Sequence, residues 1–247
     1  VLHLGGVESC YYVYLNGQRV GMAKDSRLPT EFDLTPFLRP GDNDLAVMVI
    51  RWSDGSFLED QDHWWMAGIH RSVYLYSTDQ AYLEDIAAVA GLDSSYRNGT
   101  LEIRAKLGFA REPKTAFKIR ARLFGPDGKK ALKNDLEAEV DPSYRRSYYE
   151  CVLDAKIPRP QRWSAEEPHL YTLVVSLLDA KGKATEHTGI RLGFRSVEVQ
   201  QRRFLVNGQP VLLKGVNRHE HDERYGKTVS RQSMLQDILL LKQFNLD

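Results

Sequence analysis

Apolar and charged residues alternate at period two along the middle third of the chain, which predicts strands rather than helices. Positions 101–109 and 117–123 place apolar side chains at every second residue, with Glu, Arg and Lys between them. Each run would bury one face and expose the other. Pro126-Asp127-Gly128 predicts a turn, and a further strand is predicted over 171–178, before a turn at 179–182. Short strands at this spacing predict an immunoglobulin-like β-sandwich of about 100 residues.

The first third also has the pattern of strands. Tyr11–Leu15 and Gln18–Val20 flank Asn16-Gly17, the dipeptide that favours the two positive φ angles of a type I′ hairpin turn. Leu45–Ile50 is a continuous apolar run of strand length, and Val73–Tyr76 predicts another strand. Because only a few strands and no amphipathic helix occur in 77 residues, we expect part of a β-sandwich.

The last third changes character. A second Asn-Gly hairpin is predicted from Arg203–Val206 and Gln209–Leu213, followed by a polar loop over 215–226. Ser230 then predicts the N-cap of a helix whose apolar stripe includes Met234, Ile238 and Leu241. A strand, a loop and a helix form the opening of an α/β unit, which cannot enclose a core by itself. We therefore expect the chain to be truncated at this end, and also at its start, where no methionine stands.

Composition narrows the functional classes. The 247 residues are 42% hydrophobic and 27% charged, with a formal net charge of +1, which is ordinary for a globular protein. The longest apolar run, 45–50, is far shorter than the ~20 residues of a membrane span, so a membrane partner is not expected. The balanced charge argues against nucleic acid as a partner. Cys10 and Cys151 have no spacing motif, which favours a reducing compartment over a disulfide framework.

Two clusters have residue types suited to binding chemistry. The first, residues 51–65, holds four carboxylates and three of the four tryptophans. It fits a solvated acidic loop beside core tryptophans, and it also fits a carbohydrate or hard-cation site, because carboxylates accept hydrogen bonds from sugar hydroxyls.

The second cluster is the polar loop Gly215–Glu223. His219 and His221 lack the i, i+4 spacing of a helical zinc site. The loop fits a polar turn with satisfied histidines, or the substrate-contacting loop that follows a strand in a (β/α)₈ barrel.

The sequence resembles the bacterial β-galactosidases of glycoside hydrolase family 2. The blocks that support the resemblance occur in the family's order along the whole chain: 24–34, 51–62, Met66–Arg71, Trp163–Tyr171, Gly193–Arg195 and 215–221. The β-glucuronidase branch of the family, the runner-up, usually lacks the Arg-Trp-Ser-Asp-Gly and Glu-Asp-Gln-Asp blocks. A non-catalytic carbohydrate-binding or complementation module is the alternative from another class.

The resemblance implies a mainly β chain of three modules. These are the C-terminal part of a jelly-roll sugar-binding domain (1–77), an immunoglobulin-like sandwich (78–195) and the start of a TIM (β/α)₈ barrel (196–247). It implies hydrolysis of terminal β-D-galactosides with retention, by two glutamates about 5 Å apart. In the family both glutamates follow the position of Asp247, so no catalytic residue is expected here and the 247-residue chain alone is predicted to be inactive.

Two site residues match family positions. Asp62 matches the jelly-roll aspartate that binds galactose hydroxyls and a sodium ion, and His219 matches a barrel histidine that contacts the sugar. The family's Mg²⁺ ligands are expected downstream of this chain. The resemblance further implies a β-galactoside as partner, a cytoplasmic location and a homo-oligomer, which in the family is often a tetramer.

Overall fold

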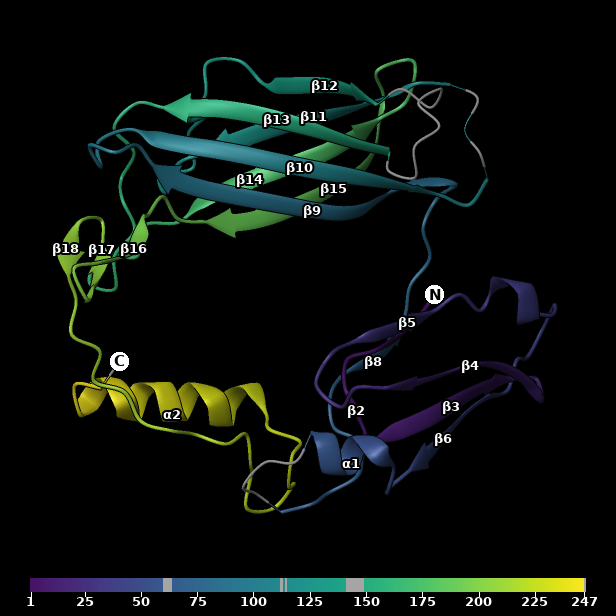
Figure 1. The fold of residues 1–247 in the computed structure, drawn as a ribbon. Coiled ribbons are helices and arrows are strands. Elements are labelled where there is room, and N and C mark those ends of the chain that lie inside the picture. The colour runs from purple at the N-terminus through teal and green to yellow at the C-terminus, as the bar shows by residue number, and fades with distance from the viewer. Residues whose placement is uncertain (60–63, 112, 114, 141–148, 247) are drawn as a thin grey trace. The chain divides into compact units, whose positions relative to one another are not determined.

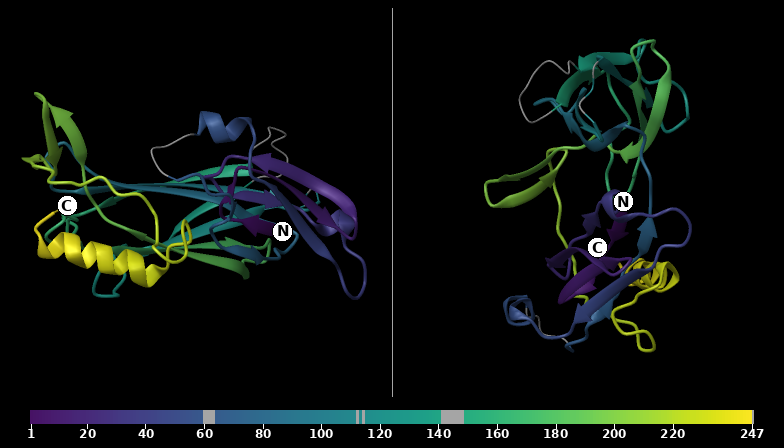
Figure 2. Two further views of the ribbon diagram at one scale, coloured as in Figure 1. Left: turned by 90° about the horizontal axis from the view of Figure 1, so that it is seen from below. Right: turned by 90° about the vertical axis from the view of Figure 1, so that its right-hand side faces the viewer.

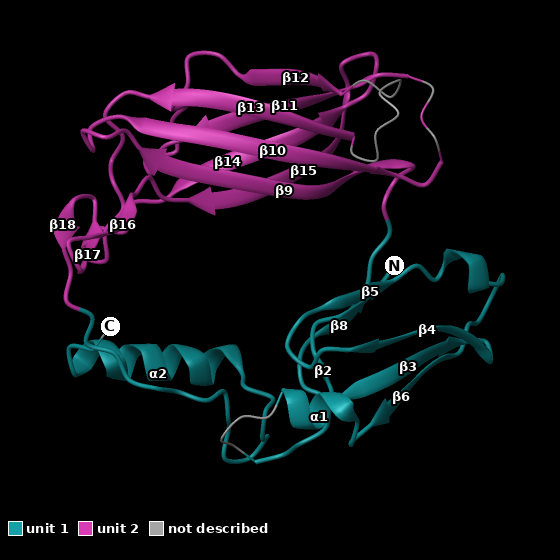
Figure 3. Ribbon diagram, viewed as in Figure 1, with its two compact units in different colours: residues 1–77, 213–247 teal, residues 78–212 magenta. Residues whose placement is uncertain are grey.

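A computed structural model describes residues 1–59, 64–111, 113, 115–140 and 149–246. The chain divides into two compact units, Val1–Ser77 together with Leu213–Asp247, and Thr78–Leu212 (Figure 3). The helices and strands are mapped in Figures 1 and 2. Each unit is described by itself.

The first unit contains two three-stranded antiparallel sheets and a small two-stranded ladder, in the orders β5-β1-β8, β4-β3-β6 and β2-β7. The strands are β1 (Leu2–Leu4), β2 (Val7–Glu8), β3 (Cys10–Leu15), β4 (Gln18–Lys24), β5 (Thr30–Phe32), β6 (Leu45–Ile50), β7 (Gly68–Ile69) and β8 (Val73–Leu75). Their inward residues form one core, made of Leu2, Leu4, Val7, Tyr11, Val13, Leu15 and Leu34. The apolar run of β3 is thereby buried, whereas β6 and β8 are largely exposed, with Met48 48% and Leu75 65% exposed.

The predicted hairpin at Asn16-Gly17 is confirmed. Both residues have positive φ angles, 53° and 79°, and Leu15 pairs with Gln18 across the turn. The strands predicted at 45–50 and 73–76 are β6 and β8.

Two short helices of this unit were not predicted. A 3₁₀ helix, η1, spans Thr35–Phe37, and α1 spans Asp54–Leu58 within the acidic cluster. At the start of α1 the Ser53 N–H donates to Ser56 Oγ at 3.1 Å, so a local hydrogen bond starts a helix too short to show an apolar period.

The second unit is a sandwich of two antiparallel sheets, β13-β10-β9 and β12-β11-β14-β15. The strands are β9 (Ala81–Leu92), β10 (Gly99–Phe109), β11 (Phe117–Phe124), β12 (Leu136–Val140), β13 (Tyr149–Ile157), β14 (Tyr171–Leu178) and β15 (Ala184–Leu192). Every second residue of β10 from Leu101 to Leu107 is buried, as the alternation predicts. The turns at 126–128 and 179–182 are also confirmed, by Gly128 N–H to Gly125 O and Gly182 N–H to Asp179 O, both 2.9 Å.

A small sheet, β16-β17-β18, completes this unit, with β16 at Val197–Gln200, β17 at Arg203–Val206 and β18 at Gln209–Pro210. The second Asn-Gly turn is confirmed, with φ angles of 53° at Asn207 and 75° at Gly208. Asn207 Nδ2 donates to the Trp163 carbonyl at 3.0 Å, which attaches the hairpin to the sandwich.

The strand expected over 209–213 is shorter than predicted. β18 ends at Pro210, Val211 N–H adds one bond to Phe204 O, and no strand is formed over 211–221. A parallel barrel strand is held by hydrogen bonds to its neighbours, and none of the described strands pairs with this segment. His219 therefore lies in a segment without strand rather than at a strand's end.

The predicted C-terminal helix is confirmed as α2, Arg231–Gln243. Ser230 Oγ accepts a hydrogen bond from Ser233 N–H at 3.1 Å, which is the expected N-cap contact. None of the residues of α2 is buried, and its apolar stripe is open, with Ile238 53% exposed. The helices formed by the described residues are all too short or too polar to cross a membrane.

Candidate functional site

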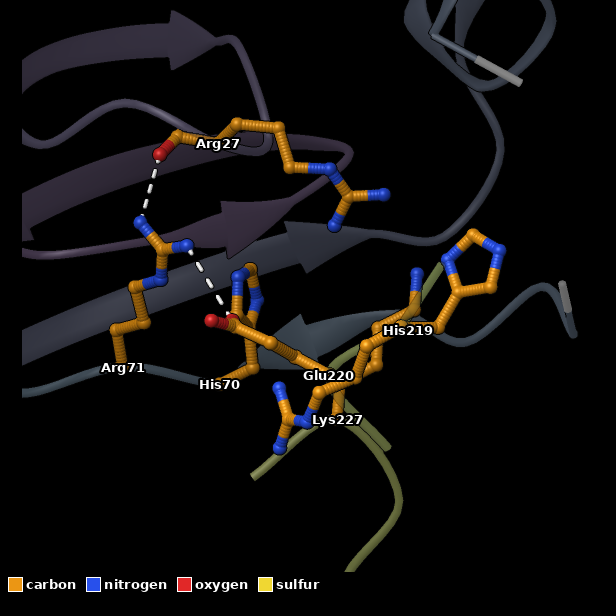
Figure 4. A pocket seen from close by; sticks show the side chains of 7 residues that line it. Arg27, His70, Arg71, His219, Glu220 and Lys227 are labelled. Atoms are coloured by element: carbon orange, nitrogen blue, oxygen red, sulfur yellow. Dashed lines mark hydrogen bonds and ion pairs between the residues drawn. The ribbon is translucent and has the colours of Figure 1, made fainter. Parts of the chain in front are cut away.

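A cavity of about 210 Å³ lies in the first unit, beside the polar loop that follows strand β18. Its lining residues are Arg27, His70, Arg71, Arg218, His219, Glu220 and Lys227 (Figure 4). The structure thus places His219, one of the two predicted sugar-binding residues, in the wall of a cavity.

Backbone hydrogen bonds place Arg27 on one side of this cavity. Arg27 follows β4 in a turn where Asp25 Oδ1 accepts from the N–H groups of Arg27 and Leu28, both at 3.2 Å. Between them, the buried Ser26 donates its N–H to Glu59 Oε2 at 3.1 Å. The polar stretch 24–34 is thereby fixed against the acidic cluster.

His70 and Arg71 come from the segment after β7. His70 N–H donates to Gly6 O at 3.2 Å, and a Cβ on Gly6 would lie 2.8 Å from His70 Nε2. Only glycine at position 6 therefore leaves room for the imidazole where it stands. Both ring nitrogens of His70 are buried without a hydrogen-bond partner among the described residues. Burial, with Arg71 nearby, lowers the pKa of His70, which favours the neutral ring.

The cations of the cavity face carboxylates. Lys227 Nζ donates to Glu8 Oε2, and Arg27 Nη1 lies 3.8 Å from the same oxygen. Arg71 Nη2 lies 3.6 Å from Glu220 Oε2. Arg218, two residues before Glu220, places its Nη2 2.7 Å from Asp237 Oδ2 on α2. Each of the four cations has a carboxylate within 4 Å, but Glu8 faces both Lys227 and Arg27, so these groups together keep a net charge of +1.

Two carboxylates of the acidic cluster, residues 51–65, are engaged in contacts within the fold. Lys24 Nζ lies 2.8 Å from the Asp54 carboxylate and, as the main cause, lowers the pKa of that group. Glu59 is engaged by the Ser26 amide. These two carboxylates therefore serve the local fold. Asp62, the other predicted sugar-binding residue and the predicted sodium ligand, lies outside the described residues, as does Asp60. Among the residues that are described, no group of three or more His, Cys, Asp or Glu could hold a metal ion.

The tryptophans of the acidic cluster extend toward the polar loop. Trp64 packs edge-on against the His221 ring, with centroids 5.3 Å apart, although 74% of Trp64 is exposed. Trp65 contacts Trp52 in the same manner at 5.0 Å. The structure therefore brings the two sequence clusters together in space, with the exposed Trp64 side chain beside the loop of His219.

Sequence reasoning assigned no role to Glu8, His70, Arg71 or Lys227. Arg71 lies in one of the blocks that support the family resemblance, so a signal was present there. Glu8 and Lys227 are 219 positions apart, and no local pattern links them. Only the fold reveals that pair.

The chain belongs to glycosyl hydrolases family 2. Three models of that family match along it: the sugar binding domain at residues 1–79, the family 2 domain at 81–195 and the TIM barrel domain at 197–247. Among curated proteins, the chain is similar to several that are named beta-galactosidase. The one from Photobacterium profundum is 44% identical over 98% of this chain, and that from Priestia megaterium is 41% identical over 98%. The chain spans about 23% of the length of each relative.

Solved structures agree with the fold. A Bacteroides uniformis beta-glucuronidase matches 98% of this chain and 30% of its own with a TM-score of 0.86 at 22% identity. A putative beta-galactosidase from Bacteroides fragilis matches 98% of this chain and 37% of its own with a TM-score of 0.85 at 22% identity. At this identity the likeness concerns the fold alone.

Proposed function

We propose that this chain is part of a retaining β-galactosidase that hydrolyses terminal, non-reducing β-D-galactosides. The observation that supports this most strongly is the identity of 40–44% to several proteins named beta-galactosidase, each covering 98% of this chain. That similarity extends over both sequence clusters and the stretch that contains Arg27. The proposed activity is that of the whole protein, because this chain spans only about 23% of the length of its relative from Photobacterium profundum.

His219 is proposed to contact the hydroxyl groups of the galactose ring. It lines a cavity in which each cation has a carboxylate of Glu8, Glu220 or Asp237 within 4 Å. The exposed indole of Trp64 beside the loop is of a kind that suits the C–H face of a pyranose. The identity to proteins named beta-galactosidase favours a galactoside over a glucuronide as the substrate.

Asp62 is proposed to bind the same sugar and a sodium ion, on the strength of the resemblance alone. The magnesium ligands and the two catalytic glutamates are expected in other parts of the protein. A cytoplasmic location and a homo-oligomer are proposed on the same basis.

The site assignment is tested by replacing its two residues in the complete gene product. We expect His219→Ala and Asp62→Ala each to lower kcat/KM for p-nitrophenyl β-D-galactoside by about 100-fold, because each substitution removes polar contacts to the sugar in its transition state. His169→Ala, which replaces a half-buried histidine of the second unit, is the matched control and should leave kcat/KM unchanged.

An unchanged kcat/KM in either site variant would remove that residue from the sugar site. Complete absence of galactoside hydrolysis by the wild-type gene product would instead favour the non-catalytic carbohydrate-binding module.

A further inference from the structure

The loop that holds His219 is attached to the sugar-binding module on both of its sides. On the far side, Lys227 donates to Glu8 at the end of β2. The two side chains are only 10% and 16% exposed, so the pair is largely removed from water. Water competes weakly with an ion pair in such a place, and removing one partner would leave the other charge buried and uncompensated.

On the near side, Glu220 is directly adjacent to His219 and forms an ion pair with Arg71 at 3.6 Å (Figure 4). Arg71 Nη1 also donates to the Arg27 carbonyl at 2.8 Å. Arg27 in turn approaches Glu8 at 3.8 Å, which connects the two attachments. Since the Arg71 and Glu220 side chains are 42% and 56% exposed, this second attachment is the weaker of the two.

The segment between the attachments is closed by its own hydrogen bonds. Asp222 and Gly226 bond reciprocally through their backbones, at 2.7 and 3.0 Å. Asp222 Oδ1 also accepts from the N–H groups of Arg224 and Tyr225, at 2.9 and 3.1 Å. A closed turn transmits a displacement of Lys227 to Asp222, which is three residues from His219.

We propose that Glu8 and Lys227 are positioning residues of the sugar site, and that their buried ion pair holds His219 at the sugar. The inference rests on the proposed function, because it acts through the contact of His219 with the substrate. His70 lies beside this pair with a neutral ring and does not replace either charge. The groups that face Glu8 are therefore Lys227 and Arg27, of which Lys227 makes the direct hydrogen bond.

The test is a set of variants of the complete gene product assayed with p-nitrophenyl β-D-galactoside. Glu8→Gln and Lys227→Met should each lower kcat/KM by about 10-fold, since a loosened loop misplaces His219. The double variant should be no worse than either single variant, and Lys227→Arg, which keeps the charge, should recover most of the activity. Lys118→Met, which removes an ion pair with Glu139 in the sandwich, is the control and should have no effect.

A purely structural role is separated by repeating Glu8→Gln in the His219→Ala background. We expect no further loss there, because the contact that the ion pair positions is already gone. An equal loss in both backgrounds, or unchanged kcat/KM in Glu8→Gln and Lys227→Met, overturns the inference while leaving β-galactosidase activity established. A wild-type protein without galactoside hydrolysis overturns the proposed function itself. If Glu8→Gln does not fold, Lys227→Met and Lys227→Arg provide the same comparison.

Discussion

Individual residues of this chain show how burial decides chemistry. Cys10 and Cys151 are free and buried, and burial raises the pKa of Cys151 to about 11, so its thiol is held protonated and unreactive. Burial acts on His70 in the opposite direction, since it disfavours the charged imidazolium. His70 lines the cavity of His219, and neither cysteine does. The titration of His70 should be measurable as a change in the free energy of unfolding with pH.

We predict that protonation of His70 destabilises the folded protein. Its pKa in the folded state is lowered from the ordinary 6.5, so the unfolded chain binds the proton first as the pH falls. The stabilisation is therefore complete above about pH 6.5 and is lost progressively below it. His70→Phe should reduce the difference in free energy of unfolding between pH 7.5 and pH 5.5, measured by urea denaturation. An identical pH difference in the variant and the wild type would show that His70 is not the group responsible.

At the scale of elements, the helices and strands that could be predicted were those marked by turn-forming residues or by alternating apolar positions. Both Asn-Gly hairpins formed as expected, because their positive φ angles depend on two adjacent residues. The first barrel strand did not extend to Leu213, because a parallel strand depends on neighbours that local sequence does not describe. Helix α1 was missed for the opposite reason, since its five residues contain too few apolar positions to reveal a period.

Two glycines of the sandwich allow the effect of backbone conformation to be distinguished from the effect of limited space for a side chain. Neither Gly128 nor Gly189 would bring a Cβ within 4 Å of another atom, but only Gly128 has a positive φ, of 77°. Gly128→Ala should lower the free energy of unfolding by about 1 kcal/mol, because an L side chain is strained in that region. Gly189→Ala, in strand β15, should raise it by about 0.5 kcal/mol. Equal midpoints of urea unfolding in the two variants would contradict a backbone origin of the effect.

At the scale of the whole molecule, the family and the class of fold could be inferred from the order of the sequence blocks that resemble the family, and the three family models confirm both. His219 lies in a cavity wall, and its contact with the sugar stays a prediction. The ion pairs around it could not be predicted, because Glu8 and Lys227 are brought together only by the folding of segments 219 positions apart. Asp62 lies outside the described residues, so its role stays a prediction.

The central claim is that the cavity of His219 belongs to a site for a neutral galactoside. It is tested most directly by measuring kcat/KM of the complete gene product with p-nitrophenyl β-D-galactoside and with p-nitrophenyl β-D-glucuronide under the same conditions. We predict a preference for the galactoside of at least about 100-fold, because the chain is 40–44% identical to proteins named beta-galactosidase. An equal or higher kcat/KM for the glucuronide would contradict the claim.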